Sequence, residues 1–238
     1  MNYLVTRLHK SGHTNIESIL DLWRQLDKET ESIKDIERFG SSIWKIWQTT
    51  DIFSTNIQNR IYSVNGHWEP MEMAAKTSSC YLFTKQDGLT TVFTILSTEK
   101  EAIGSVQSLI ANIYHPVEQV NLERFFEQNK SLPVQAASIY EDVRDLEIIS
   151  NYTWSKPIML SKVFDELPSS NLLSITAIVN IPIVNLRVRI LNVSTMSCQI
   201  NFFVETEKTP DLQEEKSLIK GLFVLADRVF EGNQLTAS

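Results

Sequence analysis

The sequence has little cysteine and little glycine, and each shortage excludes a class of protein. Its two cysteines, Cys80 and Cys198, are too few for a disulfide scaffold or for a zinc site of the Cys₄ or Cys₂His₂ type. Both lie in apolar, strand-like runs, which favours buried, reduced thiols. Only seven glycines occur in 238 residues, and no glycine-rich phosphate-binding motif is present.

Long apolar runs and an excess of positive charge are also missing. Residues 1–10 lack the apolar region of a secretory signal, and the most apolar stretch, 177–184, is interrupted by Asn180 and Pro182. We therefore expect no membrane span and a cytoplasmic location. The net charge is −7, without the basic footprint of a nucleic-acid-binding protein. The charge balance instead favours a basic protein partner.

What remains is the composition of a globular protein, with 42% hydrophobic and 21% charged residues. Residues 3–8 are typical of a strand, and apolar residues at helical spacing begin at Ile16. A second helix is predicted for residues 29–49 from the spacing of isoleucines and tryptophans, with a break at Gly40.

The middle of the chain carries the clearest turn and cap patterns. Residues 80–96 predict a β-hairpin, because an Asp-Gly pair at Asp87 separates two runs of β-branched and aromatic residues. A helix is predicted to follow, with its start at Ser97. Residues 151–160 are predicted to be rich in loops.

The C-terminal part predicts three more strands and one helix. The strands are expected at 172–179, 186–191 and 198–205. The helix is expected to start at Thr209-Pro210-Asp211, where a capping residue is followed by proline. Leu222 and Leu225 belong to its predicted buried face.

Residues 81–114 and 186–230 share one order: strand, turn, strand, capped helix. This repetition predicts an α+β protein with an antiparallel sheet, helices packed on one face and two ββα-type units. No low-complexity linker divides the chain, so a single domain over 1–238 is predicted, with 1–130 and 131–238 as the alternative halves.

Candidate metal ligands do not form a recognisable set. His9 and His13 are four residues apart, but Gly12 lies between them and disfavours a helix, so surface histidines are the simpler interpretation. Glu205 and Glu207 lie near Lys208, which is one position away from the Glu-x-Lys spacing of metal-dependent nucleases. We predict no metal site and no cofactor.

Nucleophile motifs are equally incomplete. The Ser-x-x-Lys spacing occurs at Ser42–Lys45 and at Ser217–Lys220, but the companion elements of serine acyl-enzymes are absent. Both copies lie on predicted helices whose apolar faces already account for them. We therefore predict no catalytic residues.

The tryptophans divide into two groups. Those at 23, 44 and 47 fit the buried faces of the predicted N-terminal helices. Trp68 and Trp154 lie in loop-like stretches, and exposed aromatic side chains on loops are natural anchors for a protein partner. The alternative is that the side chains of Trp68 and Trp154 fold back on the core.

An acidic run at residues 141–147 supplies the other candidate contacts. Glu141, Asp142 and Asp145 are interrupted by Arg144, which favours a solvated face over a metal site. Such a face complements a basic surface. With Trp68 and Trp154, these residues form the predicted partner-binding set.

The Asn65-Gly66 turn, the hairpin at 80–96 and the helix start at Thr209 follow an early strand and helix. In this order the chain resembles the small α+β immunity proteins of bacterial toxin systems. The resemblance implies an acidic, non-enzymatic inhibitor that occludes a toxin. Two alternatives are a metal-dependent hydrolase of an unrecognised family, using carboxylates such as Glu205 and Glu207, and a structural subunit of a phage or defence assembly.

Overall fold

The structure is a computed structural model, which describes the following residues: 1–12, 15–30, 33–51, 60–62, 68–70, 75–111, 122–143, 146–167, 172–181, 186–191, 199–205 and 210–235. Its helices are α1 (Ile16–Thr30), α2 (Lys100–Ala111), α3 (Leu122–Gln128), α4 (Leu160–Glu166) and α5 (Leu212–Phe230). Its strands are β1 (Asn2–Ser11), β2 (Ile33–Gly40), β3 (Ile43–Asp51), β4 (Arg60–Tyr62), β5 (Trp68–Pro70), β6 (Ala75–Asp87), β7 (Thr90–Ser97), β8 (Pro133–Val143), β9 (Leu146–Met159), β10 (Leu172–Ile181), β11 (Leu186–Leu191) and β12 (Gln199–Val204).

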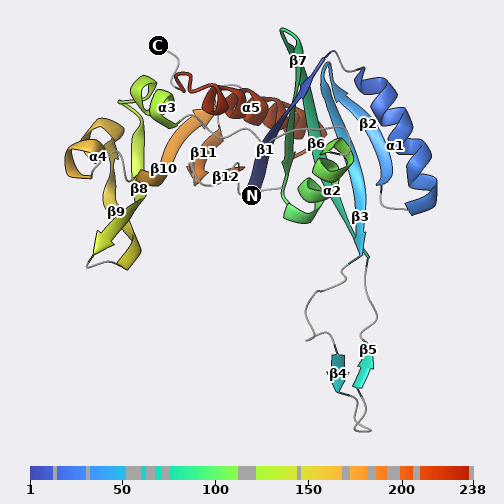
Figure 1. The fold of residues 1–238 in the computed structure, drawn as a ribbon, viewed down its shortest axis with the longest axis horizontal. Helices are drawn as coiled ribbons and strands as arrows, with labels where there is room; N and C mark the ends of the chain where they lie inside the picture. The colour runs from blue at the N-terminus through green and yellow to red at the C-terminus, as the bar shows by residue number, and fades with distance from the viewer. Residues whose placement is uncertain are drawn as a thin grey trace.

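Ten of these strands form one antiparallel sheet in the order β2-β3-β6-β7-β1-β12-β11-β10-β8-β9 (Figure 1). The N-terminal strand β1 lies inside the sheet, with β7 on one side and β12 on the other. It thereby joins β2, β3, β6 and β7 to β8–β12. Strands β4 and β5 pair separately as a small ribbon.

The predicted α+β class with an antiparallel sheet is confirmed, and the helices are divided between two faces rather than sharing one. Helices α1 and α2 pack with Leu8 of β1 in one core, whereas α3, α4 and α5 pack with Tyr3 and Val5 in the other. Successive side chains of a strand point to opposite faces of the sheet. Because β1 is apolar on both faces, each face needs its own cover.

The strand-strand-helix order predicted twice is present as β6-β7-α2 and β11-β12-α5. The two helices lie on opposite faces: Cys80 and Leu82 of β6 belong to the core of α2, and Tyr81 belongs to the core of α5. The two units are therefore similar in order but not in the side of the sheet that they cover.

The helix predicted for residues 29–49 is wrong, because residues 33–40 and 43–49 belong to the antiparallel pair β2–β3. Trp44 and Ile46 of β3 are buried in the core of α1 and α2, and Ile43 is buried in the core of α5. A strand covered on both faces loses the alternation of apolar and polar residues. Its apolar residues then imitate helical spacing.

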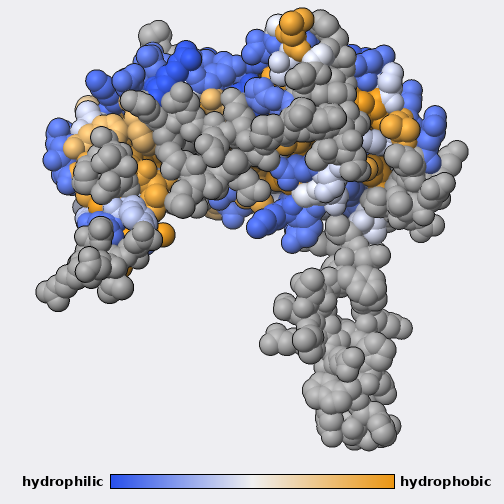
Figure 2. Space-filling view, in the orientation of Figure 1, coloured by the Kyte–Doolittle hydropathy of each residue, from blue (hydrophilic) through white to orange (hydrophobic). Residues whose placement is uncertain are grey.

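The hairpin predicted for residues 80–96 is confirmed as β6–β7. Asp87 pairs with Thr90, so the loop consists of Gly88 and Leu89, and Gly88 has a φ of 56° that favours glycine. Leu89 is 80% exposed, and Figure 2 shows hydrophobic surface at this tip. The Asn65-Gly66 turn lies outside the described residues.

The predicted C-terminal helix is confirmed as α5, but its N-cap is Asp211. The Asp211 carboxylate accepts hydrogen bonds from the backbone N–H groups of Gln213 and Glu214, and Glu214 accepts one from the N–H of Asp211. This reciprocal pair is a capping box. Leu222 and Leu225 are buried, as predicted.

The loop-rich stretch predicted for residues 151–160 is wrong, because these residues belong almost entirely to the long strand β9. Pro157 lies in this strand, although proline cannot donate a backbone hydrogen bond to a neighbouring strand. Strand β9 is the last strand of the sheet and has a partner on one side only. Proline is tolerated in such an edge strand.

Candidate functional site

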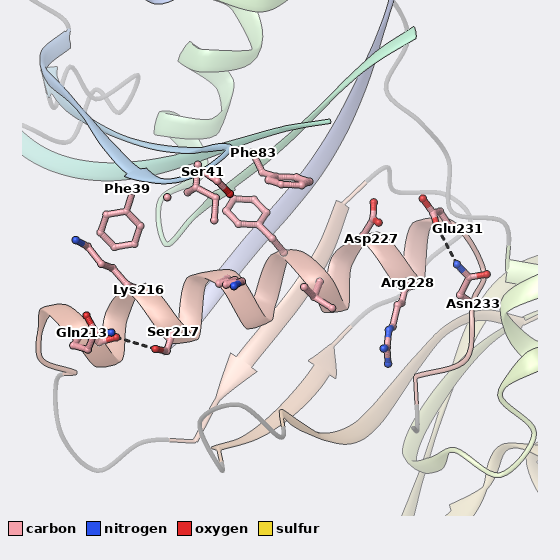
Figure 3. A pocket seen from close by; sticks show the side chains of 15 residues that line it. Phe39, Ser41, Phe83, Gln213, Lys216, Ser217, Asp227, Arg228, Glu231 and Asn233 are labelled. Carbon is pink, nitrogen blue, oxygen red and sulfur yellow. Dashed lines mark hydrogen bonds between the residues drawn. The ribbon is translucent and has the colours of Figure 1, made fainter. Parts of the chain in front are cut away.

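A groove of about 520 Å³ lies beside α5, opposite the turn between β2 and β3 (Figure 3). Helix α5 supplies one wall, and Phe39, Ile43 and Phe83 form the apolar part of the other. A volume of this size is within the range of sites that hold a small ligand or a few side chains, about 300–1,000 Å³.

Apolar side chains from both walls meet inside this groove. The rings of Phe83 on β6 and Phe223 on α5 lie 5.4 Å apart at an interplanar angle of 32°. Val224 also lines the groove and is 45% exposed. The groove therefore offers apolar surface to an incoming side chain.

The outer part of the groove carries positive charge. Lys216, Lys220, Val224 and Arg228 line it at intervals of four residues, which places them on one stripe of α5. The Lys216 ammonium lies 5.5 Å from the centroid of the Phe39 ring. Among the described residues, no carboxylate forms an ion pair with any of these three cations.

Two carboxylates at the same end of α5 are paired with cations from the sheet. Asp227 Oδ1 lies 2.6 Å from Nη2 of Arg7, whose side chain is only 2% exposed. Lys85 Nζ donates to both Asp227 oxygens at 2.9 Å and also to Glu231. These four residues hold α5 against β1 and β6 and balance each other's charge.

The pKa values of Glu231 and Lys85 in this cluster favour their charged forms. Burial alone would raise the pKa of Glu231, but the hydrogen bond from Lys85 and the charges of Lys85 and Arg7 lower it below its ordinary value. Burial alone would lower the pKa of Lys85, but the hydrogen bonds to Glu231 and Asp227 raise it. Glu231 is therefore an anion at neutral pH, and it does not act as a proton donor there.

A second polar cluster fixes the start of α5. Lys45 Nζ lies 2.8 Å from Glu215 Oε1, and the Tyr81 hydroxyl donates a hydrogen bond to the same oxygen. Burial and then the charge of Glu215 raise the pKa of Tyr3 to about 12. Burial and the hydrogen bond to Glu215 raise the pKa of Tyr81 further still. Both phenols are protonated at neutral pH.

The two Ser-x-x-Lys pairs do not form activated nucleophiles. Ser217 and Lys220 both line the groove, but the Ser217 hydroxyl donates to the backbone oxygen of Gln213 at 3.0 Å (Figure 3). Lys45 lies on a strand rather than the predicted helix and is paired with Glu215. Neither lysine has a hydrogen bond to the serine of its motif.

The predicted anchor Trp154 lies on β9 rather than on a loop. Its ring is half-buried against the core of α5, and its indole N–H donates to Glu166 Oε2 at 3.1 Å. Trp68 lies on β5, opposite Tyr62, and its side chain is outside the part that the structure describes.

The predicted acidic residues belong to the β8–β9 hairpin. Glu141 accepts hydrogen bonds from the hydroxyls of Ser150 and Tyr152, the latter at 3.1 Å. Asp142 lies on β8 opposite Glu147, and the side chain of Asp142 lies outside the described part. Asp145 lies outside it entirely. Trp154 follows Thr153, which pairs with Ala136, so Glu141 and Trp154 are separated by roughly 20 Å along the hairpin.

The candidate metal ligands that lie in the described residues do not come together. His9 lies on β1 and Glu205 follows β12, whereas His13, Glu207 and Cys198 lie outside the described residues. Cys80 is buried, and burial raises the pKa of its thiol. Among the described residues, no three His, Cys, Asp or Glu side chains come together as a metal site.

The same part of the chain contains no helix with the length and hydropathy needed to cross a membrane. Compared with the models of known protein families and with curated proteins, the sequence matches none of them.

Sequence patterns did not predict the groove, because its walls come from residues far apart in the chain. The row Lys216, Lys220 and Arg228 is visible in the sequence as cations at multiples of four residues. Its position opposite Phe39 and Phe83 depends on how α5 packs across β6.

Proposed function

We propose that this chain is a non-enzymatic binding protein that neutralises or escorts a protein partner, and that a segment of the partner lies in the groove beside α5. One observation carries the proposal: the groove combines apolar side chains, at Phe83, Phe223 and Val224, with a row of cations along α5. Interfaces with an apolar centre and a polar rim are typical of protein recognition.

The polar clusters around the groove also support binding. Arg7, Lys85, Asp227 and Glu231 form ion pairs that hold α5 on the sheet, and so do Lys45 and Glu215. A groove whose walls are fixed in this way loses little conformational entropy when a partner binds.

The resemblance to bacterial immunity proteins gives a narrower form of the proposal. In that form the partner is a bacterial toxin in the cytoplasm. The acidic residues Glu141, Asp142 and Asp145 would meet its basic surface, with Trp68 and Trp154 as further contacts. Glu141 and Trp154 are not among the residues that line the groove, so their contribution can be tested separately.

A display library of random peptides tests the groove directly. The wild-type protein should enrich peptides that carry apolar residues, and Val224→Glu should lose most of that binding by placing a charge at the apolar part of the groove. Leu89→Glu is the matched control, because it makes the same kind of change at an exposed residue of the β6–β7 hairpin. It should bind as the wild type does.

Failure to enrich any peptide would contradict the proposed function, and so would equal binding by the wild type and Val224→Glu. Circular dichroism of both variants checks that each keeps the fold. A glutamate is compatible with a helix at position 224, so loss of binding with an unchanged spectrum is assigned to the groove.

A further inference from the structure

We propose that the groove beside α5 is specific for an acidic segment of the partner, whose carboxylates meet Lys216, Lys220 and Arg228 while its apolar side chains enter the groove. This inference rests on the proposed function and adds the chemistry of the partner.

The argument begins with the charge at the groove. The chain is acidic overall, at −7, yet the stripe of α5 beside the groove carries cations at three of its four positions. Lys220 and Arg228 are exposed, so they can reach a ligand without losing an existing ion pair among the described residues. A row of one sign of charge favours a ligand of the opposite sign.

The carboxylates that line the groove do not cancel this row. Asp227 and Glu231 are each bonded to Lys85, and Asp227 is bonded to the buried Arg7 as well. Two anions are therefore balanced by two cations of the sheet. The charges of Lys216, Lys220 and Arg228 remain for a ligand.

The length of the row suits a peptide. Residues 216 and 228 are separated by about 18 Å along the helix axis at 1.5 Å per residue. That distance equals about twelve residues of a helix or about five to six residues of an extended strand. Val224 lies between Lys220 and Arg228 and faces the same groove as Phe223. A segment that alternates apolar and acidic side chains would match both the apolar part of the groove and the row of cations.

Three labelled synthetic peptides of about twelve residues test this inference by fluorescence anisotropy. The first carries leucines and glutamates, the second has lysine in place of each glutamate, and the third has serine in place of each leucine. The wild type should bind the leucine–glutamate peptide about tenfold more tightly than the lysine peptide, since each exposed ion pair contributes up to about 1 kcal/mol. It should bind the serine peptide about tenfold more weakly as well, because that peptide has no leucines to bury in the groove.

Charge reversal supplies the decisive comparison. The pair Lys220→Glu and Arg228→Glu should lose that preference and favour the leucine–lysine peptide. The matched control is Lys130→Glu with Lys162→Glu, which makes the same change of net charge at exposed residues outside the groove. The control should keep the wild-type order of affinities.

Each other outcome overturns at least one of the two proposals. Equal binding of both leucine peptides, lost in Val224→Glu, would retain the protein-binding function and overturn the acidic specificity. Weak binding of all three peptides together with sedimentation on phosphatidylglycerol vesicles would overturn both and assign the groove to an anionic lipid. The same order of affinities after charge reversal at 220 and 228 would overturn the role of the cation row.

Discussion

Arg7 on the first strand and Asp227 near the end of the last helix are 220 positions apart in sequence, and their side chains lie 2.6 Å apart. Arg7 also lies with its guanidinium carbon 5.5 Å from the centroid of the Phe230 ring. A buried guanidinium in this position needs a nearby anion, because an uncompensated buried charge is strongly unfavourable. The pair therefore fixes where α5 crosses β1.

Asp227→Asn should lower the free energy of unfolding. Removal of one partner from a buried ion pair costs about 3–5 kcal/mol, and the partial exposure of Asp227 reduces our expectation to about 2–3 kcal/mol. Urea denaturation measures the change. Asp165→Asn, at an exposed position of α4, is the control and should change stability by less than about 0.5 kcal/mol. Equal values for the two variants would show that the ion pair does not stabilise α5.

Leu222→Ala should destabilise the protein by about 2–5 kcal/mol, because Leu222 is fully buried between α5 and the sheet. Glu214 lies on the same helix but is an unsuitable neutral control, since it takes part in the capping box. The exposed Lys220→Ala serves instead and should be nearly neutral. Thermal and urea unfolding both measure the difference, and a neutral Leu222→Ala would contradict the inward orientation of this face.

Asp211→Ala should cost about 1 kcal/mol, because it removes the acceptor for the N–H groups of Gln213 and Glu214. Asp211→Ser keeps a side-chain oxygen at the N-cap and should retain most of the stability. Denaturation curves of the three proteins give the comparison. A serine variant as unstable as the alanine variant would show that the cap acts through charge rather than through hydrogen bonds.

Stability should fall as the pH rises above about 10. Tyr3 has its pKa raised from 10.0 to about 12, first by burial and then by the charge of Glu215. Its contribution is complete below the pKa of the unfolded chain and is lost as the pH rises through the folded pKa. The pKa shifts of Tyr81 and Lys85 have the same sign. Urea denaturation at a series of alkaline pH values measures the slope.

In Tyr3→Phe the same slope should be smaller, because phenylalanine has no proton to lose. The pH dependence of stability that remains in Tyr3→Phe comes from the raised pKa values of Tyr81 and Lys85. A stability that stays constant between neutral pH and about pH 11 would contradict the burial of these phenols, since a raised pKa requires the folded state to hold the proton more tightly.

The sequence predicted those elements whose ends carry local chemistry. The β6–β7 hairpin was predicted from the Asp87-Gly88 turn, and α5 was predicted from the start signal Thr209-Pro210-Asp211 ahead of a long apolar stripe. The prediction failed where tertiary position overrides local pattern. Strand β3 is buried on both faces, and Pro157 is tolerated because β9 is at the edge of the sheet.

The candidate site was less predictable than the fold. Phe39, Phe83 and Phe223 lie on three different elements, and their meeting depends on the packing of α5 across the sheet. The residues chosen from the sequence were judged by local exposure, and Trp154 shows the weakness of that criterion. Its loop-like neighbours form a strand, and its ring packs on the core.

The position of β1 inside the sheet has a consequence for synthesis on the ribosome. This strand is made before both of its neighbours. It can pair with β7 once residues 90–97 have emerged, but its other edge stays open until residues 199–204 follow. The backbone N–H of Val204 then donates to the carbonyl of Met1 at 2.8 Å. Contacts between such distant residues slow folding, and an open apolar strand edge invites association with other nascent chains. We expect the growing chain to need a chaperone more than the completed, folded protein does.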